Sequence, residues 1–172
     1  IAAVLDPGDT ILADANGGWS RQEAIRFARA VEGTRNVILE QPCATFESCL
    51  AVRRLTSLPM VLDEIIVDLG DLVRGISAEA MDHVNLKIGR VGGLTRARLM
   101  RDVAVELGLR LTIEDTWGGD IVTAAVAQLA AGVPGDVLCA VSFMNDWTNE
   151  HVAGHQPRSA GETGPVPDGP GL

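Results

Sequence analysis

Five ionisable side chains each follow a short apolar run, at nearly constant spacing along the chain. They are Asp14, Glu40, Asp63, Lys87 and Glu114, and consecutive members are separated by 23 to 27 residues. Carboxylates that converge on one spot repel each other unless a cation lies between them. Because oxygen-only donors suit a hard divalent cation, the first three acids predict a Mg²⁺ site. The alternative is that each carboxylate caps the next helix or pairs with a basic side chain.

Lys87 offers a different chemistry. It follows a strand expected over residues 83–86 and precedes a turn that contains Gly89, Gly92 and Gly93. Burial disfavours the charged form of a lysine, so a lysine at the end of a buried strand can serve as a general base. A metal opposite such a lysine suits removal of a proton next to a carboxylate. The simpler alternative is a lysine that extends from the strand end into solvent.

A strand followed by a helix is the repeating unit that positions these residues. Apolar runs predict strands over residues 10–13, 36–39, 59–62, 83–86, 109–113 and 136–143, with helices over 21–31, 46–55, 68–74, 95–107 and 121–131. Ser20 and Glu23 form a capping-box pattern, and Thr45 and Thr95 are expected to cap the second and fourth helices. Asp120 directly precedes the last helix, and its carboxylate is interpreted as capping that helix or pairing with a lysine.

The constant spacing predicts a (β/α) barrel, in which all strands place their carboxyl ends on one face. In a doubly wound open sheet the ligand binds at one switch point, which does not explain five successive polar strand ends. Six strands are visible, so two strands of a closed barrel are expected to be absent. We predict a barrel domain over residues 1–150 and an irregular tail, rich in Gly and Pro, over residues 151–172.

Composition restricts the partners and the compartment. The formal net charge of −9 argues against nucleic acid or an anionic membrane surface as the main partner. No window is apolar for long enough to predict a membrane span. The three cysteines show no CxxC spacing and are interpreted as reduced thiols of a cytoplasmic protein. We expect a homo-oligomer that acts on a small carboxylate substrate.

Four segments in this order resemble the enolase superfamily, and within it the mandelate racemase/muconate lactonizing enzyme group. They are ADANGGWS, ILEQP, VLDE and NLKIGRVGGLTRARL. The resemblance implies that Lys87 is an acid/base residue on the sixth barrel strand, and that this chain holds strands 3 to 8. It also implies an N-terminal α+β capping domain and two first strands that are absent from this sequence. The implied Mg²⁺ ligands are Asp14, Glu40 and Asp63, with Asn16 and Glu64 beside them.

The resemblance also implies a reaction. Members of this group remove the proton alpha to a carboxylate through a metal-stabilised enolate. The segment EDTWGGD, which begins at Glu114, is similar to the branch that acts on proline derivatives by dehydration or epimerisation, with cis-3-hydroxy-L-proline as an example. Asp115 and Trp117 could then face a ring nitrogen cation. Trp117 could equally be a packing residue at the barrel rim.

Other functions stay open at this point. Within the family, the chain could belong to a muconate-type cycloisomerase or a dipeptide epimerase. It could also be a non-catalytic barrel remnant. A receiver-like domain also combines strand-end acids, a lysine and Mg²⁺, but it has five strands and two acids on its first strand. The three histidines, His83, His151 and His155, lie away from the strand ends or in the tail and are interpreted as non-catalytic.

Overall fold

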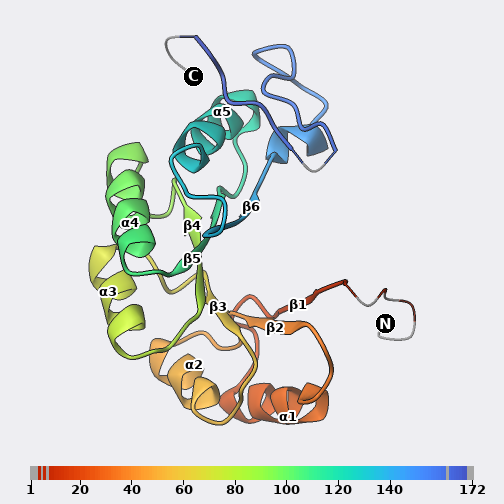
Figure 1. Ribbon diagram of the computed structural model, residues 1–172, viewed down its shortest axis with the longest axis vertical. Helices are drawn as coiled ribbons and strands as arrows, with labels where there is room; N and C mark the ends of the chain where they lie inside the picture. The colour runs from red at the N-terminus through yellow and green to blue at the C-terminus, as the bar shows by residue number, and fades with distance from the viewer. Residues whose placement is uncertain (1–3, 5, 7, 162, 170–172) are drawn as a thin grey trace. The chain divides into compact units, whose positions relative to one another are not determined.

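A computed structural model describes residues 4, 6, 8–161 and 163–169. Strands and helices alternate along this part of the chain (Figure 1). The strands are β1 (Ile11–Asp14), β2 (Val37–Glu40), β3 (Met60–Leu62), β4 (His83–Lys87), β5 (Arg110–Glu114) and β6 (Leu138–Val141). The helices are α1 (Arg21–Val31), α2 (Phe46–Arg53), α3 (Leu69–Ser77), α4 (Leu94–Glu106), α5 (Gly119–Ala130) and the 3-10 helix η2 (Met144–Trp147).

The chain divides into two compact units. The first unit comprises the residues up to 66 together with 73–83, and the second comprises 67–72 together with those from 84 onward. Strand order follows chain order in each, β1-β2-β3 in the first and β4-β5-β6 in the second. No helix in the described part of the chain is both long and apolar enough to cross a membrane.

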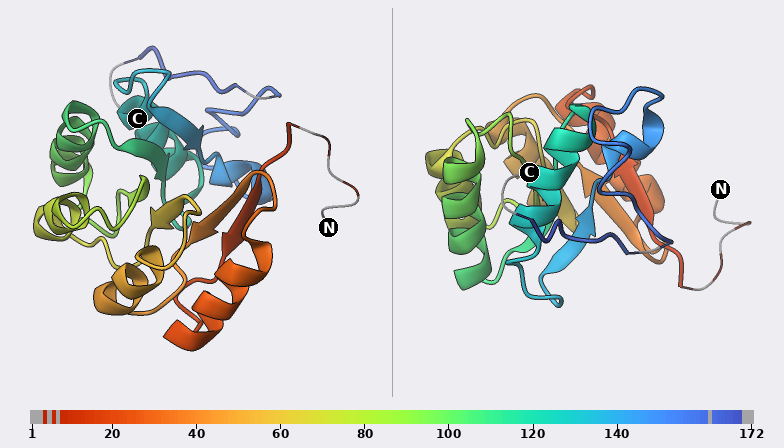
Figure 2. Two further views of the ribbon diagram at one scale, coloured as in Figure 1. Left: turned by 60° about the horizontal axis from the view of Figure 1, so that its bottom comes forward. Right: turned by 90° about the horizontal axis from the view of Figure 1, so that it is seen from above.

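In the first unit the strands are parallel. Ile11 of β1 is in register with Val37 of β2, and Asp14 is in register with Glu40. Strand β2 pairs with β3 on its other side, with Glu40 in register with Val61 (Figure 2, left). The capping box predicted for α1 is present, since the Ser20 hydroxyl accepts from the Glu23 N–H and Glu23 accepts from the Ser20 N–H. The Thr45 hydroxyl caps α2 in the expected way.

One hydrophobic cluster of the first unit lies between β1, β2 and α1. Ile11 and Val37 pack against Ala28 and Val31 of α1, together with Leu58. Successive side chains of a strand point to opposite faces of the sheet. Because Ile11 and Val37 point toward the helix, the residues one and three positions later point to the opposite face. That face therefore carries Asp14 and Glu40.

In the second unit, β5 and β6 are parallel, with Leu111 opposite Leu138 and Ile113 opposite Val141. Helix α5 contacts β5, β6 and η2, and the segment after η2 runs beside it (Figure 2, right). The expected Thr95 cap of α4 is wrong, because the helix begins at Leu94 with Gly93 at its N-cap. Gly92 and Gly93 have φ of 93° and 102°, a left-handed turn that glycine permits and that starts the helix earlier.

Candidate active site

The predicted metal ligands Asp14, Glu40 and Asp63 all lie in the first unit. Asp14 and Glu40 end neighbouring strands in register, and Asp63 directly follows β3. Since Glu40 is in register with Val61, the alternation places Asp63 on the same face, one step further along. Glu40 and Asp63 are almost fully buried, at 4% and 1% exposure, whereas Asp14 is exposed.

Asn16 contacts Asp14, as the sequence suggested. Its backbone N–H donates to Asp14 Oδ1 over 2.8 Å, and its side-chain amide donates to Oδ2. Asn16 has φ of 44°, a left-handed conformation that asparagine tolerates better than most residues. Both hydrogen bonds orient the Asp14 carboxylate through a donor only two residues away. Glu64 is half-buried and directly follows Asp63.

Gln41 is a site residue that the sequence did not reveal. It is completely buried, and its Oε1 accepts from the Asp63 N–H over 2.9 Å while its Nε2 donates to the Cys43 carbonyl over 2.8 Å. The side chain thereby joins the end of β2 to the end of β3, beside two predicted ligands. In the sequence, only its position between Glu40 and Pro42, in the segment ILEQP, indicates that it lies near the candidate ligands.

The donor set fits Mg²⁺ in ligand type and in position. Three carboxylates extend from the ends of three consecutive strands on one face, and Mg²⁺ prefers such oxygen ligands. The structure does not gather their side chains around one point, because among the residues it describes no three His, Cys, Asp or Glu side chains are placed to share a metal ion. The order and face of the strand ends therefore fit the expected site, whereas the described carboxylate side chains do not converge on one ion.

Lys87 lies in the second unit, at the end of β4. Its Nζ is 3.3 Å from Glu114 Oε1 at the end of β5, and the two side chains are only 16% and 20% exposed. The alternative of a lysine side chain that extends freely into solvent does not agree with this low exposure. Lys87 is also the single lysine of the sequence, since 13 of the 14 basic residues are arginines. Because an arginine side chain stays charged, Lys87 is the candidate proton acceptor among the basic residues of this sequence.

Asp115 and Trp117 follow β5 in the second unit. Asp115 is half-buried, and its two carboxylate oxygens accept from the backbone N–H groups of Gly89 and Thr116. Trp117 is 59% exposed, which leaves much of its ring uncovered within this chain. Contact of either residue with a substrate nitrogen stays a prediction.

The Asp120 carboxylate accepts hydrogen bonds from the tail and not from the first turn of its own helix. It lies inside α5, whose N-cap is Gly118, and the expected capping role is wrong because its carboxylate binds distant donors. Oδ1 accepts from Asn145 Nδ2 over 3.0 Å and lies 3.1 Å from His151 Nδ1, while Oδ2 accepts from the Ala153 N–H over 2.8 Å. Burial acts to raise the pKa of Asp120, but these hydrogen bonds outweigh it and hold that pKa well below its usual range.

Asp146, in η2, forms a second group of contacts with the tail. Its carboxylate accepts from the Ser159 hydroxyl and lies 2.7 Å from His155 Nε2, and the His151 and His155 rings stack with centroids 4.2 Å apart. The hydrogen bond from Ser159 lowers the pKa of Asp146, partial burial opposes this, and His155 adds to the lowering. His151 thus contacts Asp120 of α5, and His155 contacts Asp146 of η2.

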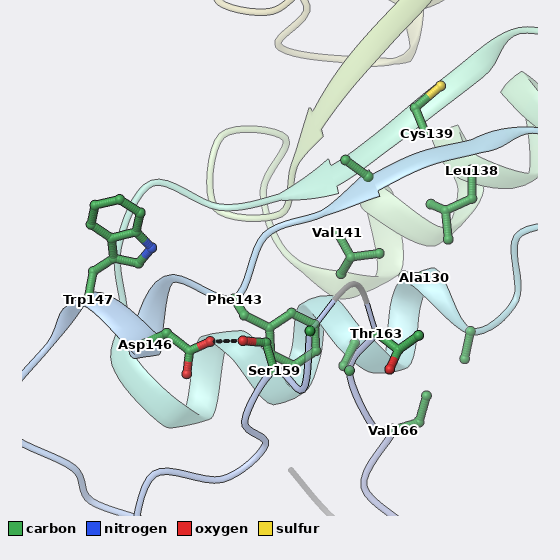
Figure 3. A pocket seen from close by; sticks show the side chains of 15 residues that line it. Ala130, Leu138, Cys139, Val141, Phe143, Asp146, Trp147, Ser159, Thr163 and Val166 are labelled. Atoms are coloured by element: carbon green, nitrogen blue, oxygen red, sulfur yellow. Dashed lines mark hydrogen bonds between the residues drawn. The ribbon is translucent and has the colours of Figure 1, made fainter. Parts of the chain in front are cut away.

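A pocket of about 720 Å³ lies beside these groups, between α5, β6 and the tail (Figure 3). Asp146 and Ser159 meet at one side of it, and Phe143 and Val141 lie along its wall. None of the candidate metal ligands and neither Lys87 nor Glu114 lines this pocket. Its volume alone is therefore no evidence for the reaction site.

Comparison with known proteins identifies the family to which this chain belongs. A family model described as "Enolase C-terminal domain-like" matches residues 1–172. The chain belongs to this enolase family. Its order of parallel strand–helix units is thus the C-terminal part of a (β/α) barrel, and its relatives are enzymes.

Two curated relatives illustrate the range of reactions. The chain is 47% identical to cis-3-hydroxy-L-proline dehydratase of Roseibium aggregatum over 170 residues, which cover 99% of the chain and 46% of that protein. It is 36% identical to o-succinylbenzoate synthase of Thermobifida fusca over 130 residues, covering 76% of the chain and 40% of that protein. The chain therefore spans about half the length of the curated relatives it matches, or less.

Solved structures agree on the fold. A mandelate racemase/muconate lactonizing enzyme from Roseovarius nubinhibens ISM matches with a TM-score of 0.82 and 38% identity, over 87% of this chain and 41% of that one. A member of the enolase superfamily from the same organism, complexed with magnesium, matches with a TM-score of 0.91 and 31% identity, over 99% of this chain and 46% of that one. The predicted barrel fold is confirmed.

Proposed function

We propose that this chain supplies the metal ligands and one acid/base residue of a Mg²⁺-dependent enzyme that removes the proton alpha to a carboxylate. The product would arise through an enolate, by dehydration or epimerisation of a small imino acid such as cis-3-hydroxy-L-proline. The observation that carries the proposal is the set of three strand-end acids, Asp14, Glu40 and Asp63, on one face of consecutive parallel strands. The 47% identity to cis-3-hydroxy-L-proline dehydratase of Roseibium aggregatum supports the substrate class.

The chain's own residues would divide the work. Asp14, Glu40 and Asp63 would hold Mg²⁺, with Asn16 orienting the exposed Asp14 carboxylate. When bound, Mg²⁺ supplies positive charge that attracts the substrate carboxylate and offsets the charge left by the departing proton. Gln41 fixes the backbone at Asp63 through its hydrogen bond to the Asp63 N–H.

Lys87 would accept or return the proton at Nζ. Glu114, 3.3 Å away, gives the amine a counter-ion and limits the directions in which it can point. The low exposure of both side chains excludes most water from the pair, which strengthens electrostatic interactions there. Trp117, which is largely exposed, would lie toward the ring nitrogen of the substrate.

The experiment is alpha-proton exchange in D₂O by the complete protein that carries this chain, with cis-3-hydroxy-L-proline and Mg²⁺. We expect Lys87→Ala to lower the exchange rate by about 10²- to 10⁴-fold, the usual contribution of a general base. Arg98→Ala is the matched control, because the Arg98 side chain is 75% exposed on α4 and should leave the rate unchanged. Exchange at the wild-type rate in Lys87→Ala would overturn the role of Lys87.

The same assay tests the metal and the substrate class. Chelation should abolish exchange, and added Mg²⁺ should restore it. If o-succinylbenzoate precursors or dipeptides react and imino acids do not, then the substrate class proposed above is wrong while the proton abstraction stands.

A further inference from the structure

One carboxylate connects the turn after β4 to the turn after β5. Asp115 Oδ2 accepts from the Gly89 N–H over 2.7 Å, and Oδ1 accepts from the Thr116 N–H over 2.8 Å. Hydrogen bonds to an ionised acceptor are shorter and stronger than neutral ones. Gly89 lies two residues after Lys87, so Asp115 holds the backbone directly behind the candidate base.

Gly89 makes this contact possible by lacking a side chain. A Cβ at this position would lie 3.0 Å and 3.2 Å from the two carboxylate oxygens of Asp115, and no other heavy atom outside its chain neighbours is as close. Gly89 does not have a left-handed φ. A Cβ at Gly89 would therefore crowd the Asp115 carboxylate, whereas the backbone conformation of Gly89 does not itself require a glycine.

The neighbouring acid acts on the side chain of the same lysine. Glu114 Oε1 lies 3.3 Å from Lys87 Nζ, and the Ile88 N–H donates to the Glu114 carbonyl over 3.3 Å. Two consecutive acids, Glu114 and Asp115, thus contact Lys87 or the backbone just after it. Glu114 faces the amine, and Asp115 binds the backbone that follows it.

We propose that Asp115 is a positioning residue for Lys87, which fixes the Lys87–Gly89 backbone through the Gly89 N–H and so holds the amine against Glu114. This inference rests on the proposed function for its effect on rate, but not for its effect on the placement of Lys87. It differs from direct contact between Asp115 and a substrate nitrogen, because both oxygens of this carboxylate already bind backbone donors.

The first test is kinetic. Asp115→Asn has the same shape but keeps only one acceptor atom, so one of the two backbone hydrogen bonds is lost. We expect kcat for alpha-proton exchange to fall by about 10²-fold, the typical effect of misplacing a reacting group by about 1 Å. KM should stay within about twofold, since no substrate contact is removed. A rise in KM with unchanged kcat would overturn the proposal in favour of substrate contact, and unchanged kinetics would overturn it as well.

A double-mutant cycle isolates the contact between the two turns. Gly89→Ala should lower kcat as strongly as Asp115→Ala, because the new Cβ displaces the carboxylate. In the Asp115→Ala background, Gly89→Ala should add little, because the carboxylate with which it collides is gone. Fully additive losses would show that the two residues act independently and would contradict the proposal.

A readout without substrate separates this inference from the proposed function. Lys87 is the single lysine of this chain, so peptide mass mapping of the complete protein can follow its rate of reductive methylation in a peptide of its own. We expect Asp115→Asn and Gly89→Ala to raise the labelling rate at Lys87 several-fold, with Asp136→Asn, an exposed position, as the unchanged control. Unchanged labelling in both variants would overturn the positioning role even if exchange activity fell. Altered labelling in a protein without exchange activity would leave it standing and count against the proposed function alone.

Discussion

Two groups of carboxylates in this chain are bound in different ways. Asp14, at the end of β1, takes hydrogen bonds from Asn16, only two residues further along. Asp120, in the first turn of α5, takes hydrogen bonds from Asn145, Ala153 and His155, which follow it by 25 to 35 residues. A local donor orients a carboxylate without tying distant parts of the chain together. Distant donors make the carboxylate part of the tertiary structure.

The two carboxylates, Asp14 with a local donor and Asp120 with distant donors, also differ in their exposure to solvent. Asp14 is exposed, while Asp120 is 1% exposed and surrounded by donors. An exposed and oriented carboxylate can accept a ligand at little cost in folding. A buried carboxylate with several internal donors cannot leave them without leaving polar groups unpaired. The contacts and burial indicate structural support for Asp120, and they are compatible with the ligand role proposed for Asp14; each role can be tested.

The largest expected effect follows removal of the Asp120 carboxylate. Asp120→Ala leaves Asn145, His151 and two backbone N–H groups without their acceptor, so we expect Tm to fall by on the order of 5 °C or more. Limited proteolysis should become faster after Trp147, where η2 ends and the chain continues toward the tail. Calorimetry and peptide mapping of the complete protein measure both effects.

Asp136→Ala is the matched control for this variant. Asp136 is an exposed aspartate between α5 and β6, and its loss should leave Tm and the proteolysis pattern unchanged. If Asp120→Ala behaves like the control, the carboxylate does not anchor the tail, and the contrast with Asp14 disappears.

The sequence predicted the parts of the molecule that depend on local patterns. The Ser20–Glu23 capping box, the strand ending at Lys87 and the spacing of the strand-end acids all follow from residues close in the chain. These local signals also carry the (β/α) repeat, because each strand and helix has its own apolar pattern. Thr95 shows the limit even here, since two glycines in a left-handed turn started the helix earlier than a cap preference indicated.

The roles that the sequence could not predict depend on distant partners. Asp120 was interpreted as the start of its own helix, whereas its donors lie in the tail, where no periodic pattern indicates how the chain returns to α5. Gln41 binds the Asp63 N–H from 22 positions away. Asp115 binds the Gly89 N–H from 26 positions away. Register between neighbouring strands decides such contacts, and spacing in the sequence does not determine register to one residue.

Substitution of Asp14 is expected to change Tm only slightly and Mg²⁺ affinity strongly. Asp14→Asn should weaken Mg²⁺ binding by about 10²-fold or more, while Asn16→Ala, which only loosens the carboxylate, should weaken it by about 10-fold. Tm without Mg²⁺ should change by less than about 2 °C in both variants, since neither side chain is buried. Calorimetric titration with Mg²⁺ gives the affinities. Equal affinity in Asp14→Asn and in wild type would exclude Asp14 from the metal site.

The smallest effect is expected at Asp146 and depends on pH. The Ser159 hydroxyl and His155 lower the pKa of the folded Asp146 carboxyl below its ordinary value of 3.8. A carboxyl with a lowered pKa in the folded state stabilises the fold above its unfolded pKa, and this contribution is lost as pH falls through the folded pKa. The contribution is therefore complete near pH 6 and decreases below about pH 4.

Asp146→Asn removes the titrating group but keeps its shape. We expect its Tm to lie about 1 to 3 °C below that of wild type at pH 6, and the difference to vanish at acid pH, where the wild-type carboxyl is protonated. Asp136→Asn, at an exposed position, should follow wild type throughout. A Tm difference that stayed constant down to pH 2.5 would mean that Asp146 acts through packing and not through its charge. Asp146 would then differ from Asp120, whose ionised carboxylate holds the tail through the hydrogen bonds that it accepts.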